Sequence, residues 1–121
     1  FKKLSKISLK DIDEFKEESN RVNLDETNDI GKITHHKGKP FTGIGFIITD
    51  GLTAKEITFE NGLKHGISKS YRNGKLFYEA IYKNDNFVEV IRGFAADGKT
   101  SLDEKKLRIM KSLIKKLHEK N

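Results

Sequence analysis

Two glutamates, Glu56 and Glu79, are the residues of this chain most suggestive of catalysis, because a pair of carboxylates on neighbouring strands can act as acid and base. They lie 23 residues apart in similar local sequences, so an internal repeat explains both of them. Lys55, Arg72 and Lys83 are available as counter-charges, and cross-strand ion pairs on a solvated sheet contribute under about 1 kcal/mol each. The pattern therefore favours structural ion pairs over acid–base catalysis.

The histidines are the next candidates, either as metal ligands or as a base. His35 and His36 are adjacent, and adjacent residues of a strand point to opposite faces, so the two imidazoles do not readily share one ion. His36 occupies the repeat slot of Phe59 and Tyr82, which predicts a packing role. The other two histidines are expected to be exposed, in a turn and at a helix end: His65 and His118.

Aromatic residues beside basic ones could stack the bases of a single-stranded nucleic acid. Tyr71 and Phe94, however, fall in the same alternating slot as Ile48, which predicts that they are core residues. The glycines belong to turns, since none of them forms a phosphate-binding loop between a strand and a helix. No set of nucleophile, base and oxyanion donors can be assembled, so we expect neither an enzyme nor a cofactor.

Composition fits one domain that does not cross a membrane. The chain has 121 residues, 35% hydrophobic and 35% charged, and lacks the run of roughly 20 apolar residues that a spanning helix needs. It has no cysteine, which excludes disulfides and thiolate metal sites. It begins with phenylalanine, so we expect a trimmed product; the compartment stays open, and an exported or lipid-anchored bacterial precursor remains compatible with the sequence.

The organisation of the chain is a repeat. An offset of 23 residues aligns residues 41–62 with 64–85, pairing Gly43 with Gly66 and Asp50-Gly51 with Asn73-Gly74. Partial units flank these two full ones. Within each unit apolar and polar residues alternate with a period of two, and Asp-Gly, Asn-Gly or Asn-Asp dipeptides separate the segments, so each unit is predicted to be a β-hairpin. An isolated hairpin is marginally stable, hence successive hairpins should pair edge to edge around a continuous apolar face.

The fold class that follows is mainly β (α+β): an antiparallel β-meander of hairpin repeats over residues 31–100, capped by an amphipathic α-helix over 101–121. Ser101 and Glu104 have capping-box spacing, which predicts a helix beginning there. Its apolar stripe is expected to pack on the sheet face that carries Ile44, Phe46, Tyr71 and Phe94, with membrane or partner binding by this helix as the alternative; the stripe comprises Leu107, Met110, Leu113, Ile114 and Leu117. Residues 1–30 are expected to form an arm or a short helix containing Leu9, Ile12 and Phe15.

Residues 31–100 resemble the bacterial MORN-repeat-variant family, the antitoxin-like repeat proteins of a proposed toxin–antitoxin pair. The resemblance rests on "KGKPFTG" at 37–43, "NGLKHG" at 61–66 and "YRNGKL" at 71–76. It implies antiparallel hairpins stacked into an elongated sheet, binding to other molecules, and no catalytic residues. The structural repeat positions are Gly43, Gly66, Tyr71, Asn73, Gly74 and Phe94. The third unit departs from the pattern, with Asn84-Asp85 for Asn-Gly and Glu89 for the repeat glycine, which predicts a terminal capping unit.

Two functions follow as hypotheses. The first is a non-enzymatic protein–protein interaction module that uses the polar sheet face and loop row, with this candidate surface for an unidentified protein partner: Lys64, His65, Ser68, Ser70, Arg72, Glu79 and Lys83. The second is weak binding to an anionic surface, phospholipid or nucleic acid, because the net charge is +6 and residues 103–121 hold seven basic and three acidic side chains. The membrane version also predicts that Leu107 and Leu113 are exposed.

Overall fold

The computed structural model describes residues 20–119 of the chain. The expected short helix with Leu9, Ile12 and Phe15 lies outside the described residues. The elements in chain order are β1 (Arg21–Asn23), the 3-10 helix η1 (Leu24–Glu26), β2 (Asn28–Ile30), β3 (Ile33–His36), β4 (Lys39–Pro40), β5 (Gly43–Thr49), β6 (Leu52–Glu60), β7 (Leu63–Arg72), β8 (Lys75–Lys83), β9 (Asn86–Gly93) and α2 (Glu104–Glu119).

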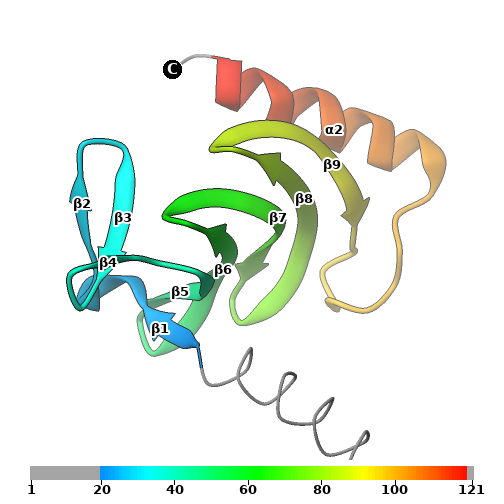
Figure 1. Ribbon diagram of the computed structural model, residues 1–121. Helices are drawn as coiled ribbons and strands as arrows, with labels where there is room; N and C mark the ends of the chain where they lie inside the picture. Colours follow the sequence, from blue (N-terminus) through cyan, green and yellow to red (C-terminus); the bar gives the residue numbers. More distant parts are fainter. Residues whose placement is uncertain (1–19, 120–121) are drawn as a thin grey trace, which may run out of the picture.

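The main sheet confirms the predicted β-meander with a C-terminal helix. Strands β5 to β9 pair in sequence order, each antiparallel to the next, and β1 adds to β5 in parallel. The sheet twists strongly, and α2 lies beside β9 at the far end from β1 (Figure 1). The hairpin order therefore follows directly from the repeat.

The hairpin turns have the conformation that their sequences predict. In the four turns of the main sheet, both central residues have positive φ, which is the pattern of a type I′ turn and matches the twist of the flanking strands. Asn73 and Gly74, for example, have φ of 52° and 77°. The fourth turn keeps the conformation with Asn84 at 49° and Asp85 at 73°, so the departure from Asn-Gly does not change its geometry.

Residues 28–40 do not extend the main sheet. Strands β2, β3 and β4 form a separate three-stranded sheet, which stands to one side in Figure 1. It is tied to the main sheet at Gly62, whose carbonyl accepts from Thr34 N and whose N–H donates to Phe41 O. A Cβ at Gly62 would lie 2.3 Å from Ile33 Cγ2, so only glycine fits this close approach.

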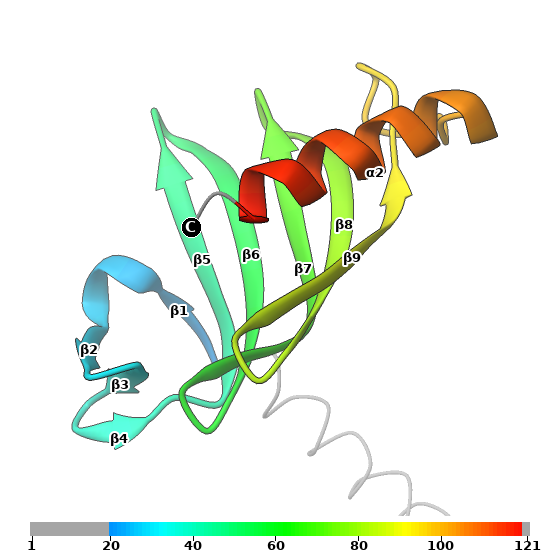
Figure 2. The same cartoon turned by 90° about the horizontal axis from the view of Figure 1, so that it is seen from above.

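The apolar core consists of two clusters on one face of the main sheet, called here the helix face. The first joins Phe41, Ile57 and Phe59, with Val22 and Leu24 packed against them. The second cluster joins β8, β9 and α2, and its members are Ala80, Val90 and Ile114 with Tyr78, Phe87, Leu107 and Met110. Helix α2 crosses in front of β8 and β9 in Figure 2, which is the packing that buries Ile114.

The prediction that α2 packs on the face with Ile44, Phe46 and Tyr71 is wrong. The helix packs on the opposite face, through residues such as Ala80 and Val90. Those side chains do share one face, but the same face carries the ion-paired Glu56 and Glu79, so the helix packs on the opposite, more apolar face.

The predicted capping box is also wrong in its cap residue. Ser101 forms a β-bridge with Phe94, so the chain is still extended there. Asp103 caps the helix instead, because its Oδ1 accepts from Lys106 N at 2.8 Å, and α2 begins at Glu104.

Candidate interaction surface

A row of charged side chains crosses the sheet face opposite α2. Along this row Phe46 is paired with Glu56, Glu56 with Lys69, Lys69 with Glu79, and Glu79 with Arg92, each pair on adjacent strands. We call this side of the sheet the ladder face. Phe46, Lys69 and Arg92 occupy one repeat slot and the two glutamates another, so the repeat itself produces the alternation of charge.

At the β1 end of the row, Glu56 is held by two donors. Arg21 Nη2 donates to Glu56 Oε2 at 2.5 Å, and Tyr71 Oη donates to Oε1 at 2.8 Å. Burial raises the pKa of Glu56, but the hydrogen bonds from Arg21 and Tyr71 outweigh it and the net pKa is lowered. Burial and the carboxylate acceptor together raise the pKa of Tyr71 to about 12. Glu56 is therefore a fixed anion at neutral pH.

At the β9 end, Glu79 lies beneath an exposed arginine. Arg92 Nη1 donates to Glu79 Oε1 at 2.9 Å, with side chains that are 64% and 8% exposed respectively. A buried carboxylate needs such a charged partner, because an unpaired one is strongly destabilising. Glu79 therefore orients the exposed Arg92.

Isoleucines lie beside the charged row on the same face. Ile67 on β7 is paired with Ile81 on β8, and Ile44 on β5 is paired with Thr58 on β6, whose hydroxyl donates to the carbonyl of Ile67. Ile67 is 42% exposed although it lies on a central strand. Among residues 20–119, both apolar clusters lie on the other face, so this strip has no apolar cover in the described part of the chain.

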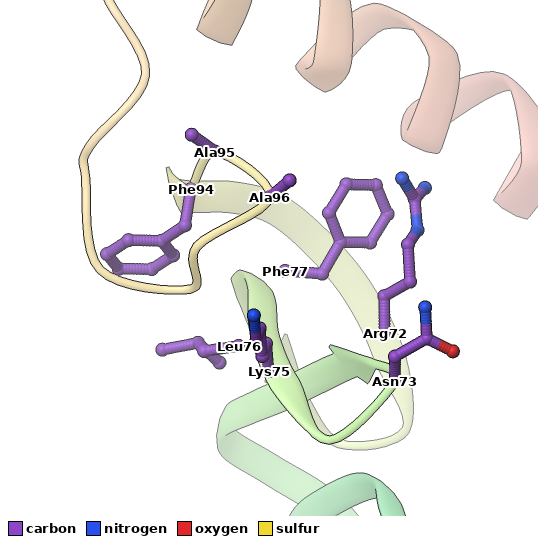
Figure 3. A pocket seen from close by; sticks show the side chains of 8 residues that line it. All are labelled: Arg72, Asn73, Lys75, Leu76, Phe77, Phe94, Ala95 and Ala96. Atoms are coloured by element: carbon purple, nitrogen blue, oxygen red, sulfur yellow. The ribbon is translucent and has the colours of Figure 1, made fainter.

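Two hollows border the ladder face. The first holds about 170 Å³, less than the roughly 300–1,000 Å³ of typical ligand pockets, and in it Arg72 lies over the Phe77 ring at 3.8 Å (Figure 3). The second, of about 610 Å³, lies where Ile44, Thr58 and His65 meet at the strand ends. His65 Nε2 lies 3.8 Å from Glu60 Oε2 there.

The structure does not bring the seven predicted surface residues together. Ser68 and Ser70 pair with residues of the helix face and are buried, whereas Glu79 is buried on the ladder face. The nitrogen Nζ of Lys64 lies over the ring of Tyr82, away from the row. The grouping of the serines with Glu79 is thus corrected: the bulges move them to opposite faces. His65 and Arg72 border the two hollows, and Lys83 is exposed beside the last turn.

The repeat positions have structural roles. Gly43 and Gly66 have φ of 150° and 105°, and a Cβ at Gly43 would lie 2.4 Å from the carbonyl oxygen of Asn20. The prediction that Tyr71 and Phe94 are core residues is wrong, because neither belongs to an apolar cluster. Tyr71 lies on the ladder face, and Phe94 lies beside the first hollow while its backbone bridges to Ser101.

Sequence reasoning did not place Arg21, Lys69 and Arg92 beside the two glutamates. The available signal was the 23-residue spacing of Lys69 and Arg92, which repeats like that of the glutamates. The pairing of Arg92 with Glu79 was not predictable. If β8 and β9 paired without bulges from Lys83–Asn86 onward, Val90 would lie opposite Glu79.

The structure also tests the predictions about the histidines, metal binding and membrane spanning. His36 packs edge-on against Phe41 with ring centroids 5.9 Å apart. His118, expected to be exposed, is half-buried: its ring stacks on Phe87 at 3.9 Å and hydrogen-bonds to Tyr82. Within residues 20–119, no group of three or more metal-ligating side chains forms. The described helix is not long and apolar enough to cross a membrane.

Comparisons of the chain with models of protein families, with curated proteins and with solved structures gave no match.

Proposed function

We propose that this chain is a non-enzymatic module that binds a protein partner through the ladder face. The observation that carries the proposal is the row of alternating charges next to the exposed Ile67. Protein interfaces combine an apolar centre with a polar surround, and the ladder face has both within one strand spacing.

The fixed charges would supply specificity. Arg21 and Arg92 are held at the two ends of the row by buried or half-buried glutamates, so little side-chain entropy would be lost when a partner carboxylate binds them. Complementary charges across an interface also select the partner and its register. A partner with acidic groups flanking an apolar side chain would fit this arrangement.

The resemblance of residues 31–100 to the MORN-repeat-variant family supports the same proposal. Members of that family are thought to act by contacting other molecules, and its antitoxin-like label favours a protein as the partner. The hollow beside Ile44 and His65 would offer a recess for a partner side chain at the edge of the same face.

The test is affinity capture from an extract of cells that express the protein natively, comparing wild type with Ile67→Lys. The matched control is Ile30→Lys, which adds the same charge at a residue 59% exposed on the separate small sheet. We expect one stoichiometric protein to be retained in high salt by wild type and by Ile30→Lys, and lost with Ile67→Lys. Equal capture by all three chains, or recovery of nucleic acid alone that elutes with salt, would refute the proposal.

A further inference from the structure

Helix α2 has a second apolar stripe, which points away from the sheet. Ile109, Leu113 and Leu117 are 53%, 57% and 60% exposed. They are spaced by four residues, so successive members lie about 40° apart around the helix and form one narrow stripe. The other side of the helix, with Leu107 and Ile114, packs on β8 and β9, so the expectation of exposure is confirmed for Leu113 and wrong for Leu107. Burial of the helix in the fold therefore leaves this stripe uncovered by the described residues.

Lysines flank the exposed stripe. Helical geometry places Lys105 and Lys116 along one border of the stripe and Lys106 in line with it, before Ile109, and all three lysines are exposed. Within residues 20–119, none of these three lysines forms an ion pair with a carboxylate. The solvent side of α2 therefore combines aliphatic side chains with uncompensated positive charge.

We propose that the solvent side of α2 binds the surface of anionic phospholipid bilayers, with the helix axis parallel to the membrane. Leu113 and its two neighbours in the stripe would enter the boundary between headgroups and acyl chains, while the lysine stems extend toward lipid phosphates. This function is independent of the proposed partner site, since α2 packs on the face of the sheet opposite the charged row. A membrane-bound molecule would leave the ladder face accessible.

The shape and chemistry of this surface favour a bilayer over other anionic partners. A protein groove that encloses a helix would need the side on which Ile114 is already packed, whereas a flat bilayer needs one side alone. Nucleic acid binds by stacking its bases on aromatic side chains and binds aliphatic side chains weakly, whereas the exposed stripe consists of isoleucine and leucine.

The test is co-sedimentation of the full chain with vesicles of phosphatidylcholine plus phosphatidylserine and with vesicles of phosphatidylcholine alone. The charge variant is Lys105→Gln/Lys106→Gln/Lys116→Gln. The apolar variant is Leu113→Gln/Leu117→Gln, chosen because these exposed residues can change without loss of folding. The matched control, Lys32→Gln/Lys37→Gln/Lys39→Gln, removes the same charge from exposed lysines of the small-sheet region.

We expect binding to the anionic vesicles alone. Each surface lysine contributes about fivefold to partitioning, so the charge variant should bind about a hundredfold more weakly and the control only a few-fold. The apolar variant should also bind at least tenfold more weakly. The proposal is overturned if wild type does not sediment with anionic vesicles, or if the charge variant and its control weaken equally. It is also overturned if the apolar variant binds as wild type does, the result expected of a purely electrostatic, nucleic-acid-like attraction.

Discussion

Replacement of Ile114 by alanine tests which side of α2 packs on the sheet. The side chain is 7% exposed and contacts the cluster of Ala80 and Val90. The change removes three carbon atoms beyond Cβ at about 0.8 kcal/mol each, and incomplete collapse of the cavity adds to this, so the free energy of unfolding should fall by about 3 kcal/mol. That is a large share of the roughly 5–15 kcal/mol of a typical domain.

The assay is urea unfolding followed by far-ultraviolet circular dichroism, with Leu113→Ala as the matched control. Leu113 is the residue just before Ile114 in the helix and is 57% exposed. Because alanine is a good helix former, this change should alter stability by less than about 0.5 kcal/mol. If Leu113→Ala cost as much as Ile114→Ala, the helix would be rotated about its axis, and the exposed stripe proposed to bind lipid would lie inside the fold.

Two further changes test the ladder and the joint between the sheets. Because the folded pKa of Glu56 is lowered, its contribution to stability is complete above its ordinary pKa near 4.5 and is lost as pH falls through the folded value. Glu56→Gln should therefore lower the free energy of unfolding by about 1 kcal/mol at neutral pH and flatten the acid side of a stability–pH curve. It should also lower the highest tyrosine pKa seen in a spectrophotometric titration. Unchanged curves would contradict the ladder geometry. Gly62→Ala should lower the melting temperature far more than Gly51→Ala, because both have positive φ but only Gly62 abuts another sheet, whereas nothing lies within 4 Å of a Cβ at Gly51. Gly51→Ala should cost about 1 kcal/mol, and equal effects would refute the contact at Gly62.

The turn and helix signals predicted the fold well because each depends only on residues that are close together in the sequence. The turn dipeptides accept positive φ wherever they occur, so Asn73-Gly74 and its equivalents specify the hairpins, and their spacing specifies the strand order. The helix was predictable for the same reason, from its periodic leucines. Its first residue was misplaced, because the bridge of Ser101 to Phe94 is a tertiary contact. Leu113 and Leu117, which were predicted to pack on the sheet, are exposed.

The two faces of the sheet were not predictable from alternation. Alternation assigns faces along one strand, but the relation between strands depends on every bulge between them. Between β8 and β9 the register shifts at two places, which is how Arg92 instead of Val90 comes to lie opposite Glu79. The sequence contains no signal that fixes these bulges, so the candidate surface mixed residues of both faces, such as Ser70 and Glu79.

The continuous apolar face expected of stacked repeats is also absent from the described residues, and this gives the charged row a structural role. Neither core cluster contains a residue of β7, whose side chains on the helix face include the buried Ser68 and Ser70. The two clusters are therefore coupled across β7 by backbone pairing and, on the ladder face, by side chains. Tyr71 on β7 donates to Glu56 on β6, and Lys69 lies between Glu56 and Glu79. Hence the polar row that we propose as a binding surface also joins the two halves of the sheet, and a partner bound across it would restrain both halves together.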